Sequence, residues 1–417
     1  MSNSNVVSLQ KPALSDPLQD ILKEGARQLL EQAVRAELAE LLEQHSSLKT
    51  EDGKSAVVRN GYLPERTIQT GLGDISVRVP KVRDRSGQGI KFHSQLIPPY
   101  LKKTKAIEEF LPWLYLRGIS TGYFSEALSH LLGPDAPGLS AATISRLKKD
   151  WIYDFQQWQK RDLSKKHYVY VWADGVYTHV RQDSKLCLLV MIGSTEDGKK
   201  ELIGLMDGYR ESIDSWAEWM LGLQGQGLKQ PPKLVIGDGA MGLWGAVNEQ
   251  WPQAKHQRCW VHKMANVLNQ LPKSMQPKVK VDLQNIWMAE SKNAANKAFD
   301  LCLKKYQAKY PKAMDTLEKD RGSMLAFYDF PAEHWGHIRT TNPIESVFAT
   351  VRHRGKRTKN CGSRETTLSM TFKLIETAQK RWRKLRGYRL LADVIQGVKF
   401  KDGERIEKNT EQSQSVA

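Results

Sequence analysis

The chain is poor in cysteine and has no long apolar run. Its four cysteines are widely scattered and form no C-x-x-C pair: Cys187, Cys259, Cys302 and Cys361. This pattern excludes a disulfide framework and predicts a reducing, cytoplasmic setting. The most apolar stretch, Leu186 to Gly193, is far too short to span a bilayer, and no basic-then-apolar signal segment opens the sequence. We therefore expect no association with a membrane through a spanning helix.

Acidic residues are scarce relative to basic ones. Lys and Arg number 63 against 46 Asp and Glu, which gives a net charge of +17 and a pI near 9.5. This imbalance indicates a polyanionic partner, most simply nucleic acid, with an acidic membrane surface as the alternative. The 417 residues, of which 40% are hydrophobic, suffice for two or three domains with a sizeable core.

The N-terminal part alternates between helical and strand patterns. Apolar spacing predicts a helix or helix pair over residues 16–44, suited to packing or dimerisation. Residues 57–82 predict a small β unit that Pro80 closes. Further helices are expected from about Thr104, over residues 123–132, and over residues 141–158 with Ser140 as the N-cap.

The strongest strand signal is the β-branched and aromatic stretch 166–177. Alternation separates Val169, Val171 and Ala173 from a second face that carries Tyr168, Tyr170, Trp172 and Asp174. Asp174 is then a carboxylate at the end of a buried strand, where a charge is costly unless it is paired or binds a metal. The alternative is that Asp174 and Gly175 simply form a turn.

The segments that follow predict more strands and helices. They are the strand Lys185 to Gly193, a turn at Asp197-Gly198, the strand Glu201 to Met206, the helix Ser212 to Leu223, the strand Lys233 to Gly237 and the helix Ala240 to Trp251. Three strands, a helix, a strand and a helix match the start of a ribonuclease H-like fold. Asp238 ends the last strand, 64 residues after Asp174 (238 − 174), and the two strands can be neighbours.

Two close carboxylates repel each other unless a cation lies between them. Mg²⁺ is the natural cation, with Mn²⁺ as a substitute, and a site for two ions needs a further acid. Glu345 is the candidate, on a helix with Asn342 as N-cap, Pro343 as first residue and an apolar face toward the sheet formed by Ile344, Val347, Phe348 and Val351. By spacing alone, a capping contact with Asn342 is the stronger role for Glu345.

Cys259 and His262 form a Cys-x-x-His pair, which suggests zinc. A structural zinc site needs four ligands, and no second pair has suitable spacing. We expect Cys259 and His262 to be structural instead, at the junction between the core and a helical insertion that runs to Trp335.

Two basic segments are expected to contact DNA. The helix start after Ser140 offers short polar and cationic side chains, as a recognition helix does, although an ordinary surface helix is the alternative. Residues 352–389 hold 13 Lys or Arg and two acids, which suits phosphate contacts or a solvated basic face. The expected contacts are Ser140, Thr143, Ser145, Arg146, Lys148, Lys149, Arg352, Arg354, Lys356, Arg357, Arg381, Arg383, Lys384 and Arg386.

Six stretches, in their order and spacing over about residues 55–395, resemble the Mutator-type transposases of bacterial insertion sequences. They are Arg59 to Tyr62, Arg117 to Thr121, Val171 to Tyr177, Leu234 to Gly239, Gln257 to Lys263 and Thr341 to Ser346. The resemblance implies a DDE transposase whose acidic triad falls on Asp174, Asp238 and Glu345, and whose Cys-x-x-His pair falls on Cys259 and His262.

The resemblance also implies a function and a set of partners. The enzyme would bind the terminal inverted repeats of its element as a homodimer on double-stranded DNA, in the bacterial cytoplasm near the nucleoid. Two Mg²⁺ ions at the triad would activate water for strand cleavage and then the freed 3′-hydroxyl for strand transfer; no membrane and no small-molecule cofactor is expected. The alternatives are a ribonuclease H-like structure-specific nuclease or resolvase and a catalytically inactive DNA-binding regulator.

The expected architecture is α/β: a ribonuclease H-like core interrupted by an all-helical insertion and preceded by a mainly helical DNA-binding region with a small β unit. The expected segments are 1–55 (N-terminal helix), 56–160 (DNA-binding region), 161–262 (first part of the core), 263–335 (helical insertion), 336–395 (last core helix and basic helices) and 396–417 (disordered tail).

Overall fold

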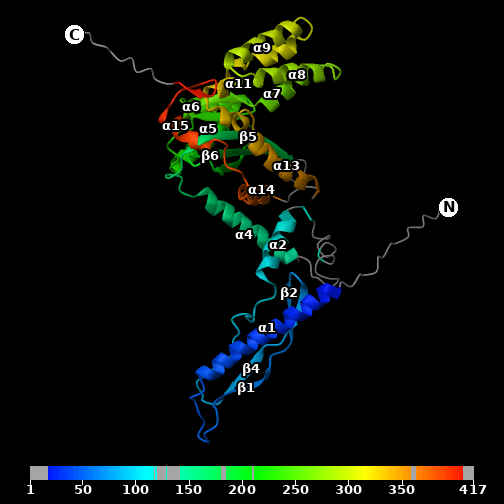
Figure 1. The fold of residues 1–417 in the computed structure, drawn as a ribbon, viewed down its shortest axis with the longest axis vertical. Coiled ribbons are helices and arrows are strands. Elements are labelled where there is room, and N and C mark those ends of the chain that lie inside the picture. Colours follow the sequence, from blue (N-terminus) through cyan, green and yellow to red (C-terminus); the bar gives the residue numbers. More distant parts are fainter. Residues whose placement is uncertain are drawn as a thin grey trace, which may run out of the picture. The chain divides into compact units, whose positions relative to one another are not determined.

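The computed structural model describes residues 17–116, 118–119, 128, 141–179, 185–208, 211–357 and 363–406. The chain divides into two compact units, residues 1–144 and 145–417 (Figure 1). None of the helices in the described ranges is long and apolar enough to cross a membrane.

The first unit packs one long helix on two short β ladders. Its elements are α1 (Pro17–Gln44), β1 (Val57–Tyr62), β2 (Arg66–Thr70), β3 (Gly73–Val77), β4 (Pro80–Asp84) and α2 (Lys105–Leu116). The ladders pair β1 with β4 and β2 with β3. Val34 and Leu38 of α1 bury against Ile68, Ile75 and Val77, so one face of α1 and alternate strand residues form the core of this unit, as their spacing predicts.

The sequence predicts that Pro80 closes the β unit, but Pro80 does not close it. It begins β4 and lies opposite Tyr62 in the antiparallel ladder with β1. A proline is tolerated there because the first residue of a strand need not donate to the ladder. The helix expected over residues 123–132 lies outside the described residues, apart from Leu128.

The second unit is built on a five-stranded mixed sheet of order β7-β6-β5-β8-β9. The strands are β5 (Tyr168–His179), β6 (Lys185–Thr195), β7 (Lys200–Gly208), β8 (Leu234–Gly237) and β9 (Lys255–Arg258). β6 is antiparallel to both β5 and β7, whereas β8 is parallel to β5 and to β9. This sheet confirms an α/β protein.

Helices cover both faces of this sheet (Figure 1). On one face, α5 (Ile213–Gly225) and α6 (Met241–Gln250) bury Trp216, Met220 and Val247 against Val171 and Val235. On the other face, α13 (Asn342–Arg357) packs on β5, and α14 (Arg364–Gln379) packs on β7. Both faces of the central strands are therefore buried, which explains their nearly continuous apolar sequence.

Strand β5 differs from simple alternation at its start. The register with β6 shifts between Tyr168 and Tyr170, and Tyr168 joins the core that holds Val171 and Ala173. An irregularity of this kind moves a side chain to the other face of the sheet, which a period of two cannot anticipate. The Asp174-Gly175 turn is also excluded, because β5 continues to His179.

Strand β9 has no counterpart in the sequence prediction. Its residues Lys-His-Gln-Arg are polar, yet Gln257 and Arg258 are buried. The Gln257 amide is satisfied, since it donates to Met324 O at 3.1 Å and accepts from Phe327 N at 2.8 Å. Apolar periodicity therefore misses a strand whose buried side chains are held by hydrogen bonds.

Between β9 and α13 the described chain is helical. The elements are α7 (Trp260–Leu268), α8 (Gln276–Trp287), α9 (Lys292–Tyr306), α10 (Pro311–Glu318), α11 (Arg321–Met324), two 3₁₀ turns (Ala326–Asp329 and Ala332–His334) and α12 (Trp335–Ile338). After α15 (Leu391–Gln396), strands β10 (Phe400–Lys401) and β11 (Glu404–Arg405) form a hairpin, so order extends into the segment expected to be a disordered tail.

Candidate active site

The two aspartates lie level with each other on neighbouring strands. In the parallel pair β5–β8, Trp172 lies opposite Ile236, and two residues further along each strand stand Asp174 and Asp238. Beyond this point β5 pairs with β6 alone. The carboxylates therefore lie where the parallel pairing ends.

Asp174 is a buried acid that lacks a counter-charge in contact. Only 5% of it is exposed, and within the described part of the chain its carboxyl group makes no hydrogen bond or ion pair. Burial raises the pKa of Asp174 to about 8, and the negative charge of Asp238 adds to this rise. A buried carboxylate in this state has a strong tendency to bind a proton or a cation.

Helix α13 brings Glu345 to the same place from 171 residues further along the chain (345 − 174). Ile344, Phe348 and Val351 are buried, as expected for the apolar face of this helix; the side chain of Val347 lies outside the described set. The Glu345 carboxylate accepts from Arg352 Nη2 at 3.0 Å and lies 3.2 Å from His262 Nε2. These contacts replace the capping contact that the spacing alone favours.

His262 and Cys259 have different roles. Cys259 is buried at the end of β9, and its Sγ accepts from Thr341 N at 3.3 Å and from Thr341 Oγ1 at 3.4 Å, so it ties the start of α7 to the start of α13. His262, one turn later, lies among the acids. A hydrogen bond with Cys259 raises the pKa of His262 to about 9 against the effect of burial, and the charges of Asp174 and Asp238 favour the same protonated form.

Asp174, His262 and Glu345 can hold one metal ion. Each offers a ligand atom, and the three atoms lie within 4.8 Å of one another; no other group of this kind occurs in the ranges that the structure describes. Two carboxylates and an imidazole form a mixed oxygen and nitrogen ligand set for a divalent cation. Asp238 stands outside this set, and its Oδ1 accepts from Ala240 N at 2.9 Å. Cys259 is not part of this group.

Gly239 allows an arginine to lie against the end of β8. Its φ is +87°, and a Cβ atom at this position would overlap the Arg258 guanidinium. Arg258 is buried, pairs through Nε with Asp320 at 3.3 Å, and leaves Nη1 without a partner in the described structure. A glycine after Asp238 is therefore a requirement of both backbone and packing.

Comparisons with known proteins identify the family of this chain. A sequence model described as "Transposase, Mutator family" matches residues 2–384. The chain belongs to the Mutator family of transposases. It is 53% identical over 279 residues, 67% of this chain and 94% of the relative, to the transposase for insertion sequence element IST2 of Acidithiobacillus ferrooxidans.

Two further relatives extend the match. The transposase for IS6120 of Mycolicibacterium smegmatis is 48% identical over 73% of this chain and 94% of its own length. The transposase for IS256 in transposon Tn4001 of Staphylococcus aureus is 30% identical over 81% of this chain and 84% of its own length. The family that the sequence motifs indicated is thus confirmed.

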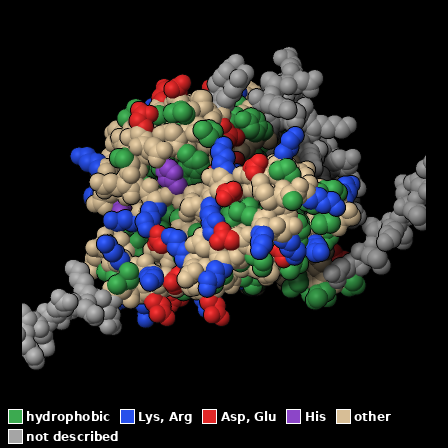
Figure 2. Space-filling view, turned by 90° about the horizontal axis from the view of Figure 1, so that it is seen from above, with side chains coloured by type: hydrophobic (Ala, Val, Ile, Leu, Met, Phe, Trp, Pro, Cys, Tyr) green, Lys and Arg blue, Asp and Glu red, His purple; other side chains and the backbone are tan. Residues whose placement is uncertain are grey.

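The structure places the expected DNA contacts of this family member on several surfaces. On α4 (Ala141–Gln159), Ser145, Arg146 and Lys149 are exposed, while Thr143 and Lys148 are half-buried; Ser140 lies outside the described residues. After α14, the exposed cations are Arg381, Arg383, Lys384 and Arg386. The side chains of Arg354, Lys356 and Arg357 are not among those described. Figure 2 shows Lys and Arg side chains dispersed among acids on one face.

The basic C-terminal segment is not one continuous surface. Helix α14 divides it, and nine consecutive or nearly consecutive residues of this helix are buried between Thr366 and Ile375. Arg352 is also engaged, by its ion pair with Glu345. Composition counts these residues together, whereas in the described part of the chain a largely buried helix separates Arg352 from the exposed cations after α14.

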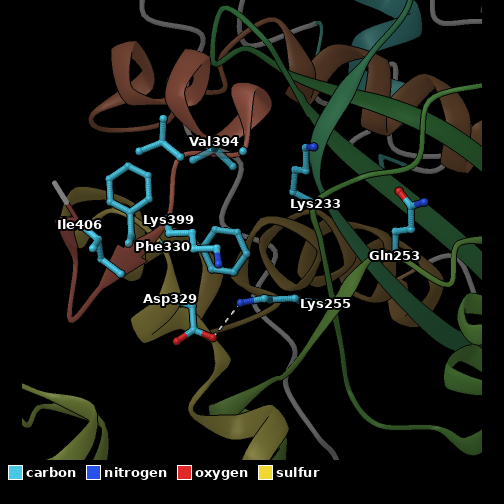
Figure 3. Close-up of a pocket in the computed structure, with 11 residues that line it drawn as sticks. Lys233, Gln253, Lys255, Asp329, Phe330, Val394, Lys399 and Ile406 are labelled. Carbon is cyan, nitrogen blue, oxygen red and sulfur yellow. Dashed lines mark hydrogen bonds and ion pairs between the residues drawn. The ribbon is translucent and has the colours of Figure 1, made fainter. Parts of the chain in front are cut away.

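A pocket of about 340 Å³ lies at the opposite edge of the sheet. Lys233, which precedes β8, and Lys255, which begins β9, line it together with Asp329 and Phe330. Figure 3 shows Lys255 directed at Asp329, and their Nζ and Oδ2 atoms are 2.8 Å apart. Because parallel strands have both N-terminal ends at this edge, the pocket is separate from the carboxylates.

Proposed function

We propose that this chain is a DDE transposase that binds the terminal inverted repeats of its insertion sequence and catalyses metal-dependent strand cleavage and strand transfer. The observation that carries the proposal is that Asp174, Glu345 and His262 lie close enough to hold one cation, with Asp238 level with Asp174 where the parallel pairing ends. Carboxylates arranged in this way suit phosphodiester chemistry on a polyanionic substrate.

The sheet order supports a ribonuclease H-like core. Three antiparallel strands are followed by two parallel strands on the other side of β5. The helical stretch from α7 to α12 separates β9 from the helix that supplies Glu345, as a helical insertion would.

Asp174 and Glu345 would hold a divalent cation together with His262, which would release its proton on binding, and Asp238 lies beside them for a second cation. When bound, such ions activate the attacking hydroxyl and stabilise charge on the phosphate. The chain's own contribution is to bury Asp174, which excludes water, and to fix the positions of the ligands. Thr341 and Cys259 hold the starts of α13 and α7 together, so Glu345 and His262 stay at a constant separation.

The DNA partner is supported by the net charge of +17 and by the exposed cations of α4 and of residues 381–386. A homodimer is supported by α1, where Ile21, Leu22 and Leu29 are 68%, 49% and 67% exposed, an apolar stripe that a second copy could cover. Exchange of Leu29 for Glu should then shift the oligomeric state in sedimentation analysis.

The test is an assay with DNA carrying the element's ends and a separate target. Wild type should cleave at the ends and join them to the target in Mg²⁺ or Mn²⁺, and Asp174→Asn should bind the ends without cleaving them. Cleavage of branched DNA without joining would favour the nuclease or resolvase alternative. Binding without cleavage in either metal would favour the inactive regulator.

A further inference from the structure

We propose that Glu211 is a fourth carboxylate of the active site and a ligand, through water, to the divalent cation beside Asp174 and Asp238. The proposal rests on the proposed function, since it adds a residue to the same metal site. Glu211 lies in the short connection before α5, whose N-cap is Ser212. Nothing in the local sequence distinguishes it, because its position only becomes meaningful once the sheet is assembled.

The carboxyl group of Glu211 lies directly over Gly175, the residue after Asp174. A Cβ atom on Gly175 would overlap Glu211 Cδ and Oε1. A glycine in a strand interior often marks close approach by another group, and here that group is an acid. The Glu211 carboxyl group therefore reaches β5 one residue after Asp174, from the face that Gly175 shares with Ala173.

The main chain of Glu211 contacts the second aspartate's segment. A Cβ atom on Gly242, in the first turn of α6, would overlap the Glu211 carbonyl oxygen. Helix α6 follows Asp238 by three residues (241 − 238). Glu211 is thus wedged between the segments that carry both aspartates, and two glycines provide the space.

The charges agree with this placement. Burial raises the pKa of Glu211, and the negative charge of Asp238 raises it further, while a hydrogen bond with Tyr177 acts in the opposite direction. Glu211 in turn adds to the rise of the pKa of Asp174. The carboxyl groups of Glu211, Asp174 and Asp238 therefore interact electrostatically. The carboxyl group of Asp174 is more than nine-tenths buried and has no hydrogen-bond partner in the described structure.

The site also lacks oxygens that a second cation would need. Both Glu345 oxygens already face His262 and Arg352, and Asp238 Oδ1 accepts from Ala240 N. Two ions about 3.5–4 Å apart need several carboxylate oxygens around them. Glu211 adds a further carboxylate, one oxygen of which is engaged by the Tyr177 hydroxyl.

The experiment is Mn²⁺ titration of the full-length chain, with free Mn²⁺ followed by electron paramagnetic resonance. Glu211→Gln keeps the shape of the side chain. It should lower the apparent affinity for Mn²⁺ by at least about tenfold, or reduce the number of bound ions by one. Glu218→Gln is the matched control, because Glu218 is exposed on α5 and loses the same charge. It should bind Mn²⁺ as wild type does.

Two comparisons make the outcomes distinct. Glu211→Asp keeps the carboxylate and should bind Mn²⁺ better than Glu211→Gln; an equal loss in both would mean that Glu211 only fills space and would overturn the inference. Equal binding by Glu211→Gln and wild type would also overturn it. Equal binding by wild type and Asp174→Asn would instead remove the metal site of the proposed function, and the inference with it. Circular dichroism of each variant confirms folding.

Discussion

The two edges of the five-stranded sheet each hold an acidic residue, and the two residues differ in whether their charge is paired. At the edge with the lysine pocket, Asp329 lies 2.8 Å from Lys255 and 3.0 Å from Lys292, so its charge is paired. At the other edge, Asp174 is more deeply buried, and its charged neighbours are His262 and the three acids Asp238, Glu345 and Glu211. The paired charge of Asp329 stabilises the fold. The acids around Asp174 repel one another, and a bound cation would reduce this repulsion. The comparison teaches that pairing with a cation, rather than burial alone, separates an acid that stabilises the fold from a candidate functional acid.

The largest effect should come from removing each acid in turn. Asp174→Asn should lower strand cleavage by more than about 100-fold while end binding persists, because a ligand to the ion is lost. Asp329→Asn should leave cleavage within about twofold of wild type. Gel assays of cleavage and binding measure both. Comparable losses of cleavage in the two variants would remove the distinction between the edges.

The next largest effect should come from Gly239→Ala. The substitution forces a non-glycine residue to φ +87° and against Arg258, so it should cost about 1–3 kcal/mol and displace the adjacent Asp238. Gly322→Ala is the control, since an added Cβ there meets nothing within 4 Å. Urea unfolding of both variants, with cleavage rates, checks this. If Gly239→Ala left the free energy of unfolding and the cleavage rate unchanged, the Arg258 side chain would move aside at little cost.

The two edges should also respond to pH with opposite signs. The pKa of Asp174 is raised to about 8 from an ordinary 3.8, so without metal its ionisation lowers stability as pH rises through this window. Burial opposes ionisation of Asp329, but bonds from Lys255 and Lys292 outweigh it and lower its pKa. Its stabilising effect is therefore present above the ordinary 3.8 and lost as pH falls through the lowered value.

Melting temperatures in a metal chelator test these signs. At pH 8.5, Asp174→Asn should melt higher than wild type, and the gap should close toward pH 5. Asp329→Asn should melt lower at both pH values, by the equivalent of about 1 kcal/mol. Destabilisation by Asp174→Asn at pH 8.5 in the absence of metal would contradict the argument.

The smallest effects concern DNA affinity. Neutralising Arg381, Arg383, Lys384 and Arg386 should weaken binding to end DNA and random DNA by similar factors, and flatten the salt dependence by roughly 0.9 in log–log slope per lost phosphate contact. Neutralising Arg146 on α4 should instead narrow the gap between the two DNAs. Titrations at several salt concentrations separate the two. The reverse pattern would exchange the roles of these regions.

Much of the site could be predicted because it depends on strand ends. Asp174 and Asp238 each follow an apolar strand, and parallel pairing makes such ends coincide. Glu345 was predicted as part of the site only through the family motif, because its spacing alone favoured a capping role. The approach of His262 depends on α7 and α13 meeting through Cys259 and Thr341, a contact that no local pattern encodes.

Other features escaped the sequence because tertiary contacts decide them. The polar strand β9 is held by hydrogen bonds of Gln257, and the shift at the start of β5 moves Tyr168 across the sheet. Glu211 shows no pattern at all until Gly175 and Gly242 are seen to make room for it. In each case a long-range contact outweighs local propensity.

The ligands of the site are far apart along the chain, at positions 174, 262 and 345. A ribosome therefore completes the β5 aspartate long before it makes the glutamate of α13. The nascent chain cannot assemble the cation site until most of the second unit has emerged and folded. If the proposed function is right, a product of synthesis or proteolysis that ends before Glu345 lacks one of the three candidate ligands and should not cut DNA.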